Sequence, residues 1–234
     1  MSIKDRYTIR EIDYKTAMDV VVRCHYAHRI APCTHAFGLY SNETGQLVGV
    51  CVYGSPASPS LCKGICGEDE VDNIYELTRL YVDDGLEKNL ESFFVGNTIK
   101  LLDKEIIVSY SDTAQGHIGI IYQASNFYYT GITAPHKEYL ASAKDGHKLH
   151  GKTVGEIYGG LEGISVALDM GIAEVTERTR KHRYVYFNCD KREKKRLLGK
   201  LRYKILPYPK QNTPVPVTSF ENIADKKSKL RKLI

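Results

Sequence analysis

The chain has 234 residues, of which 42% are hydrophobic, and a formal net charge of +5. A chain of this length suits one domain with an insertion or a tail. It contains no run close to the ~20 apolar residues that a membrane-spanning helix needs, and its polar start is unlike a secretory signal peptide. We therefore expect a soluble, cytoplasmic protein with no membrane partner.

The charge is distributed very unevenly along the chain. Residues 1–177 carry a net charge of −9, whereas residues 178–234 carry +14. A basic end on an acidic body indicates a polyanion, such as a nucleic acid, as a partner of that end. The alternative is a set of solvated lysines on a flexible tail, which suits 226–232 well and 178–204 poorly.

The first elements in chain order are a strand over 7–12 and a helix over 14–22. Five potential metal ligands follow within 24–35, but their spacing is not that of a zinc finger. A bound iron or zinc ion is thus an open alternative that we do not predict. We expect His25, Tyr26 and Arg29 to line a pocket after the helix instead, and the six cysteines of the chain to be reduced thiols.

The middle of the chain alternates between strands and helices. We expect two strands, at 36–40 and 46–53, joined by a hairpin turn. A long loop over 54–72 leads to a strand at 73–82, and an amphipathic helix follows at 89–102.

A polar stretch separates a buried strand at 106–110 from a helix at 118–125, and a further strand is expected at 127–130. This arrangement places Asp112, Gln115, His117 and Tyr122 near one rim, at the carboxyl end of a strand, where open α/β sheets bind ligands. The alternative is that Asp112 only caps the helix and Tyr122 only packs.

Changes in composition along the sequence indicate how the chain divides into segments. Two short helices are expected at 153–158 and 164–171, as a cap over the sheet or as a groove-reading pair. The expected organisation is a core over 1–135, a helical insertion over 136–180, a closing strand and basic segment over 181–210, and a disordered Pro/Lys-rich tail over 211–234.

This order of elements resembles that of the GNAT family of N-acetyltransferases. The resemblance implies an α/β (α+β) fold: a central mixed sheet flanked by helices, here with an insertion before the last strand. In that family the fourth and fifth strands splay apart, an acyl-CoA enters the gap, and a glycine-rich loop holds its diphosphate. Here the loop at 83–89 has one glycine, three carboxylates and one lysine, which makes it a poor anion cradle.

A more specific resemblance is to the Mom DNA-modification family of bacteriophage Mu and its relatives. Its motifs are His25-Tyr26, 76–80, 109–131, 181–187 and 206–210. The resemblance implies conversion of adenine in phage DNA to N6-(carbamoylmethyl)adenine, which hides the DNA from host restriction enzymes. Double-stranded DNA would then be the partner and the host cytoplasm the location. A tRNA partner and a homodimer are open alternatives.

The expected site follows from the chemistry of modifying a base. A flipped base needs aromatic faces and polar groups, and the backbone needs cations. We expect Asp112 to accept the proton of adenine N6, Tyr122 to act as general acid by analogy with GNAT enzymes, and Ser111 to orient the donor carbonyl. The substrate-binding candidates are His25, Tyr26, Arg79, Gln115, His117, Asn126 and Tyr128. The DNA-binding candidates are Lys181, Arg183, Lys191, Arg192, Lys194, Lys195 and Arg196.

The acyl donor is either acetyl-CoA or glycyl-tRNA. Acetyl transfer places the carbonyl on the wrong carbon for a carbamoylmethyl group, whereas a transferred glycyl group can rearrange into it. Arg79 either holds a donor phosphate or pairs with Glu76. The rival functions are a CoA-dependent N-acetyltransferase of a protein or small amine, and a non-catalytic DNA-binding protein on a GNAT scaffold.

Overall fold

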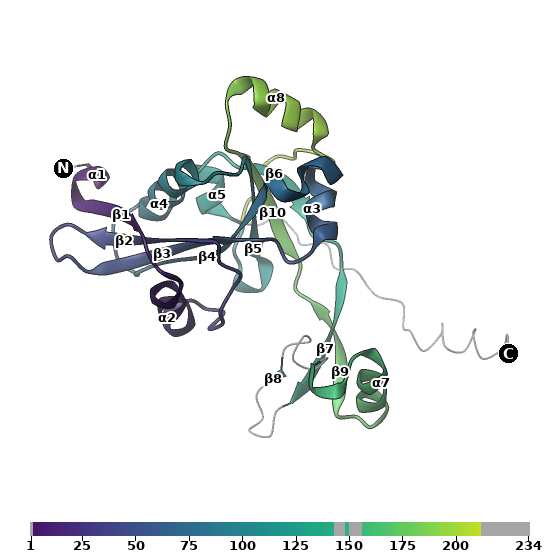
Figure 1. Cartoon of the computed structure of the whole chain (residues 1–234). Helices are drawn as coiled ribbons and strands as arrows, with labels where there is room; N and C mark the ends of the chain where they lie inside the picture. The colour runs from purple at the N-terminus through teal and green to yellow at the C-terminus, as the bar shows by residue number, and fades with distance from the viewer. Residues whose placement is uncertain (1, 143–147, 150–155, 212–234) are drawn as a thin grey trace. The chain divides into compact units, whose positions relative to one another are not determined.

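The computed structural model describes residues 2–142, 148–149 and 156–211, and they belong to two compact units (Figure 1). The larger, here called the core unit, combines residues up to Thr133 with 181–209. The described residues between 134 and 180, with Lys210 and Gln211, form the second unit, here called the insertion unit. Among the described residues, no helix is both long and apolar enough to cross a membrane.

The core unit is built on a seven-stranded sheet with the order β1-β2-β3-β4-β5-β10-β6. Its strands are β1 (Tyr7–Glu11), β2 (His35–Ser41), β3 (Leu47–Gly54), β4 (Ile74–Val82), β5 (Ile106–Asp112), β6 (Tyr128–Ile132) and β10 (Lys181–Phe187). Within this sheet β4 and β5 pair in parallel, and the other neighbours are antiparallel. The mixed sheet expected from the GNAT resemblance is therefore confirmed.

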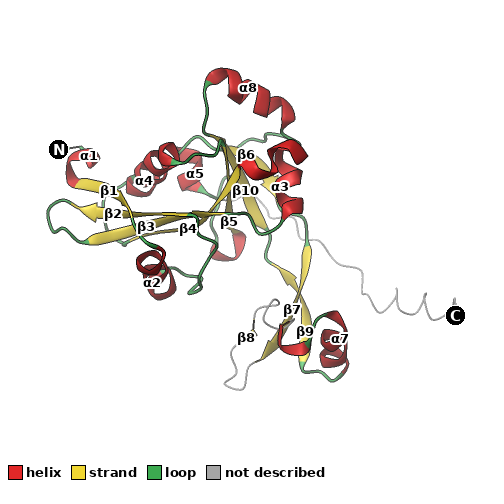
Figure 2. Ribbon diagram, in the orientation of Figure 1, coloured by secondary structure: helices red, strands yellow, loops and turns green. Residues whose placement is uncertain are grey.

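Helices cover both faces of this sheet (Figure 2). They are α1 (Ile3–Arg6), α2 (Tyr14–Cys24), α3 (Pro59–Cys66), α4 (Leu90–Thr98), α5 (Ile120–Ala124) and α8 (Lys191–Lys200), with 3-10 turns at Glu68–Asn73, Ile99–Leu101 and Thr113–Gln115.

Alternating side chains of the strands decide which helix covers which face. Tyr53 of β3 and Ile107 of β5 pack with Phe94 of α4 in one core cluster. Val52 packs with α2, and Val108 packs with α3 and α8, in clusters on the opposite face. The basic helix α8 therefore lies on the same face of the sheet as α2 and α3.

The parallel pair β4–β5 comes apart before either strand ends. Its register runs from Ile74–Ile106 to Leu77–Ser109. Beyond that point β4 continues to pair with β3, and β5 pairs with β10, as far as Asp112 opposite Lys181. The two strands thus diverge and open a gap between Thr78–Val82 and Tyr110–Asp112.

The expected loop over 54–72 contains a helix, α3, which the sequence-based prediction missed. Ser58 caps it by accepting a hydrogen bond from the Leu61 amide at 3.3 Å, and Pro59 occupies its first turn. Ile65 is buried in the core. A Ser-Pro start of this kind is a helix signal, but the short apolar face gave too weak a periodicity.

The insertion over 136–180, expected to be helical, is only partly helical in its described residues. The insertion unit contains the three-stranded sheet β8-β7-β9, formed by β7 (His136–Ser142), β8 (Lys148–Leu149) and β9 (Ala173–Arg178), together with α7 (Leu161–Asp169). The second expected helix, 164–171, overlaps α7, whereas most of the first, 153–158, lies outside the described residues. The strands escaped prediction because β7 pairs with a partner more than 30 residues away. The expected disordered tail lies, except for Gln211, outside the described residues.

Candidate active site at the divergence of two strands

Four of the predicted substrate-binding residues meet beside the gap between β4 and β5. The Tyr26 ring lies 4.3 Å from the His25 ring and 6.0 Å from the His117 ring, measured between centroids. Burial raises the pKa of the Tyr26 phenol, the charge of Asp112 adds to this rise, and the charge of Arg79 opposes it. The loop after α2, the end of β4 and the end of β5 therefore converge on Tyr26.

Asp112 is held at the rim by two contacts. One carboxylate oxygen accepts a hydrogen bond from the Ala114 amide at 2.9 Å, which caps the turn at Thr113–Gln115. The other lies 3.6 Å from the Lys181 ammonium, on the neighbouring strand. Asp112 thus both caps a turn and keeps a carboxylate oriented at the gap, and Lys181, predicted to bind DNA, is part of the same rim.

Tyr122 approaches the gap from the face of the sheet opposite to the one that α2 covers. Its ring packs against Phe127 and Tyr184, with centroids 5.4 and 5.3 Å away. Burial raises the pKa of Tyr122 to about 12, although a hydrogen bond with Ser109 opposes the rise. The phenol therefore holds its proton at neutral pH, as a general acid must before it donates.

His25 is a neutral hydrogen-bonding group. Burial, followed by the charge of Arg79, lowers the pKa of His25 to about 4. The His25 Nδ1 accepts a hydrogen bond from the Ala27 amide at 3.0 Å. In the neutral ring the proton then resides on Nε2, which leaves one N–H donor for a ligand.

Arg79 holds the loop that follows α2. Its guanidinium donates to the carbonyl oxygens of Arg29 and Ile30 at 3.4 Å and of Thr78 at 2.6 Å. Burial lowers the pKa of Arg79, the charge of Arg29 lowers it further, and Tyr26 and Glu76 oppose this shift. Arg79 is thus engaged mainly with backbone carbonyls rather than exposed for a donor phosphate.

Ser111 has a structural role that the sequence did not indicate. It is buried, and its hydroxyl donates to the His117 carbonyl oxygen at 2.7 Å. This bond closes the loop between β5 and α5. The hydroxyl is therefore engaged within the protein, and we do not carry forward its assignment to the donor carbonyl.

Gly119→Ala is expected to destabilise the core unit more than Gly116→Ala. The two glycines have similar positive φ angles, 75° and 66°, so the left-handed penalty of about 1–2 kcal/mol largely cancels in the comparison. An added Cβ at Gly119 would overlap the Tyr184 ring, whereas at Gly116 it would meet nothing within 4 Å. Denaturant unfolding of both variants measures the difference, and equal losses would contradict this account.

The structure says less about the three remaining substrate-binding candidates. Gln115 and Asn126 are exposed in turns. The Tyr128 ring packs against Phe187 at 6.0 Å, with the Lys194 ammonium 5.1 Å from its centroid. Tyr128 thus packs on the other face of the sheet from Tyr122, and we do not carry it forward as a ligand of the base. The roles of Gln115 and Asn126 stay predictions.

Two of the predicted DNA-binding arginines are bound within the protein. The Arg183 guanidinium lies 3.3 Å from the Tyr203 ring centroid and donates to the Thr130 hydroxyl at 3.0 Å. Arg196 forms ion pairs with Glu70 and Glu193. Because these side chains already have partners, we remove both from the expected phosphate contacts.

The other cations of α8 differ in how they are held. Lys200 lies 2.7 Å from the same Glu70 carboxylate that Arg196 contacts. The hydrogen bond from Arg196 is the main cause of a pKa of about 2 at Glu70. Lys191, Arg192 and Lys195 are exposed on this helix, and we keep them as expected phosphate contacts.

The sequence-based prediction missed Ser109 and considered Glu76 only as a partner of Arg79. Ser109 is buried, lies at the last position where β5 pairs with β4, and contacts Tyr122. Glu76 on β4 carries a negative charge that adds to the raised pKa values of Tyr110 and Tyr122. Side chains alternate between the two faces of a strand, so Ser109 and Ser111 lie on the same face of β5. This alternation could have identified Ser109 as a residue of the site.

The loop at 83–89 does not fit the diphosphate of a coenzyme A. Glu87 forms an ion pair with Arg6, so the loop is tied to the start of β1. Asn89, the N-cap of α4, has a φ of 69° and makes no side-chain capping bond. Asp83 and Asp84 add two further negative charges to the loop, and like charges oppose the binding of a diphosphate.

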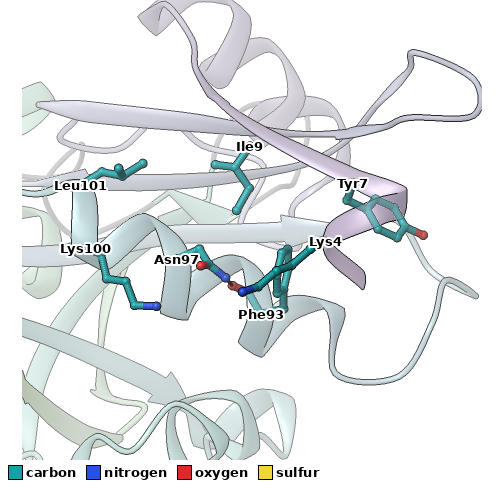
Figure 3. Close-up of a pocket in the computed structure, with 7 residues that line it drawn as sticks. All are labelled: Lys4, Tyr7, Ile9, Phe93, Asn97, Lys100 and Leu101. Atoms are coloured by element: carbon teal, nitrogen blue, oxygen red, sulfur yellow. Dashed lines mark hydrogen bonds between the residues drawn. The ribbon is translucent and has the colours of Figure 1, made fainter. Parts of the chain in front are cut away.

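A shallow depression of about 430 Å³ lies elsewhere in the core unit (Figure 3). It shares no lining residue with the gap, and its lining residues are Lys4, Tyr7, Ile9, Phe93, Asn97, Lys100 and Leu101. In the part of the chain that the structure describes, no group of three or more His, Cys, Asp or Glu side chains is arranged to hold a metal ion.

Comparison with solved structures finds distant N-acetyltransferases. A ribosomal-protein alanine acetyltransferase from Vibrio fischeri has a TM-score of 0.45 at 12% identity, over 79% of this chain and 94% of that one. A protein described as an acetyltransferase from Salmonella typhimurium with its cofactor acetyl-CoA has a TM-score of 0.42 at 11% identity, over 79% and 95%. These values carry no functional argument, and the fold assignment rests on the strand order and divergence.

Comparison of sequences is more specific. The chain is 29% identical over 201 residues to the methylcarbamoylase mom of Escherichia phage Mu, which covers 83% of this chain and 80% of that protein. The Mom protein family matches residues 6–210, a range that includes the whole divergence of β4 and β5 and every residue placed beside it. The chain belongs to the Mom protein family.

Proposed function

We propose that this protein is a transferase that converts adenine in DNA to N6-(carbamoylmethyl)adenine by acyl-transfer-type chemistry, and that the modification protects phage DNA from host restriction. The observation that carries the proposal is the gap between β4 and β5, with the Asp112 carboxylate at the end of β5 and the protonated Tyr122 phenol beside Ser109. The similarity to a protein named as a methylcarbamoylase supports the same class of reaction.

The residues at the gap would act on a flipped adenine. Tyr26, whose side chain is half exposed beside two imidazole rings, offers a face on which the base can stack. The Asp112 carboxylate accepts the N6 proton as the new bond forms, which offsets the weak nucleophilicity of that amine. The Tyr122 hydroxyl donates a proton to the leaving group of the donor.

The donor is either acetyl-CoA or glycyl-tRNA, and we favour the aminoacyl donor. The Salmonella typhimurium acetyltransferase binds acetyl-CoA, but the carboxylates of the loop at 83–89 do not suit a diphosphate here. A glycyl ester carries no diphosphate at its reacting end, so it does not require that loop. We therefore assign no catalytic step to coenzyme A.

Lys191, Arg192 and Lys195 are expected to contact phosphates without reading sequence. Replacing all three with Gln should weaken DNA binding and reduce the slope of log Kd against log salt by at most ~0.9 for each lost contact. The matched control, Lys4, Lys88 and Lys100 replaced with Gln, makes the same change in net charge at other exposed positions. An equal effect of both triple variants would mean that only net charge matters.

Mass spectrometry of nucleosides tests the proposed function directly. DNA from cells that express the protein should contain N6-(carbamoylmethyl)adenine and resist cleavage by restriction enzymes, and DNA from cells that express Asp112→Asn should contain far less of the modified base. Acetylated protein or amine without modified DNA would favour an ordinary acetyltransferase. DNA binding without any modified base, unchanged by Asp112→Asn, would favour a non-catalytic binding protein.

A further inference from the structure

The loop between α2 and β2 presents an isolated apolar side chain beside the proposed site. Ile30 is 58% exposed, although the next residue, Ala31, is buried. An exposed isoleucine on a loop is not unusual by itself. What distinguishes Ile30 is how firmly its backbone is held and what lies next to it.

Four contacts fix the backbone of this loop. Arg79 donates to the Ile30 and Arg29 carbonyl oxygens, and the Thr78 hydroxyl donates to the Pro32 carbonyl oxygen at 3.0 Å. Gly54 approaches so closely that an added Cβ would overlap the Pro32 oxygen. The Ile30 side chain is thus carried on a preorganised backbone, which costs little further ordering when a partner binds.

The Arg79 guanidinium connects the Ile30 backbone with the surroundings of the proposed base-binding residues. One guanidinium, that of Arg79, contacts the Ile30 carbonyl oxygen and carries the charge that acts on His25 and Tyr26. Arg29, which precedes Ile30, is exposed and supplies a cation for a backbone phosphate. The loop between α2 and β2 therefore carries an exposed apolar side chain, a cation and a stacking ring, a combination that suits the extrusion of a base.

We propose that Ile30 enters the base stack of duplex DNA and fills the space that the flipped adenine leaves, while Tyr26 stacks on the extruded base. Apolar side chains of this kind enter base steps in many proteins that distort DNA, and extruding a base from a duplex costs unstacking energy that single-stranded DNA does not require. This inference rests on the proposed function and names the residue that lets the site act on a duplex.

Ile30→Ala should affect the modification rate on duplex DNA but not the rate on single-stranded DNA. The variant should modify adenine in a duplex roughly 10- to 100-fold more slowly than the unsubstituted protein, because unstacking is no longer compensated. It should modify the same adenine in a single strand at the normal rate, since that base is already accessible. Ile30→Phe, which keeps an apolar wedge, should retain most of the duplex activity.

Leu101→Ala is the matched control, because Leu101 is 61% exposed and lies in the depression far along the chain from this loop. It should change neither rate. Equal losses on duplex and single strand, or no loss with Ile30→Ala, would overturn the proposal.

A binding experiment keeps the two proposals distinguishable. A duplex with 2-aminopurine in place of the target adenine becomes fluorescent when that base leaves the stack, and no chemistry is needed. Ile30→Ala should abolish the fluorescence increase, and Leu101→Ala should keep it. If the unsubstituted protein modifies no DNA, the proposed function fails. Even then, a fluorescence increase that is lost in Ile30→Ala would support the insertion of Ile30 into the base stack. An increase that is unchanged in Ile30→Ala would reject it.

Discussion

Asp112→Asn is expected to lower the rate of adenine modification by about 10²–10⁴-fold, the usual contribution of a general base. The amide oxygen of asparagine can still accept the hydrogen bond from Ala114 that caps the following turn. It cannot take up a proton from N6, and it no longer balances the charge of Lys181. The expected result is therefore a folded protein that binds DNA and modifies it poorly.

Tyr122→Phe should cause a loss of the same order. Phenylalanine preserves the ring contacts with Phe127 and Tyr184 but removes the proton that the leaving group needs. The matched control is Tyr128→Phe, which removes a phenol on the opposite face of the sheet, beside Phe187. Single-turnover rates and thermal unfolding of the three variants separate catalysis from folding. Near-normal modification by either Asp112→Asn or Tyr122→Phe would remove that residue from the catalytic assignment.

The identity of the acyl donor is expected to decide whether any modified base forms. Purified protein and DNA should form the modified base with glycyl-tRNA and none with acetyl-CoA and ammonia. After acyl transfer, the glycyl amine attacks purine C6 through a five-membered ring, and the C6–N6 bond breaks. The former N6 then becomes the terminal amide, and the product is C6–NH–CH2–CO–NH2 with no change in oxidation state.

An isotope label tests this order of bonds. With ¹⁵N-glycine on the tRNA, the label should remain attached to C6 after the amide is hydrolysed, and the released ammonia should be unlabelled. Label in the released ammonia would rule the rearrangement out. Product from acetyl-CoA would also show that the carboxylate-rich loop at 83–89 binds a diphosphate against its own charge.

The sequence alone was informative where the determinants are local. The uncharged, β-rich run at 106–110, the capping residue Asp112 and the helical spacing that follows predicted a strand, a polar stretch and a helix around Tyr122. The structure has β5, the turn at Thr113–Gln115 and α5 there. These features depend on neighbours within a few residues, which is why pattern and propensity suffice to predict them.

Only the tertiary structure decided how the charged residues are used. The cations of the basic run at 191–196 look alike in sequence, yet Arg196 bonds to Glu70, which lies 126 residues earlier. Lys191, Arg192 and Lys195 of the same run are exposed. Arg183 is likewise engaged within the protein, by Tyr203 and Thr130. The sequence therefore predicted a basic surface but could not tell which of its cations are available to a phosphate.

The site itself could be predicted only in part for the same reason. The sequence indicated His25, Tyr26, Asp112, His117 and Tyr122, but it could not show that β4 and β5 separate after Leu77 and Ser109. It also could not show that β10 would place Lys181 opposite Asp112. Strand register and long-range ion pairs depend on residues that are distant along the chain, so burial and pairing in three dimensions select among partners that composition and periodicity leave equivalent.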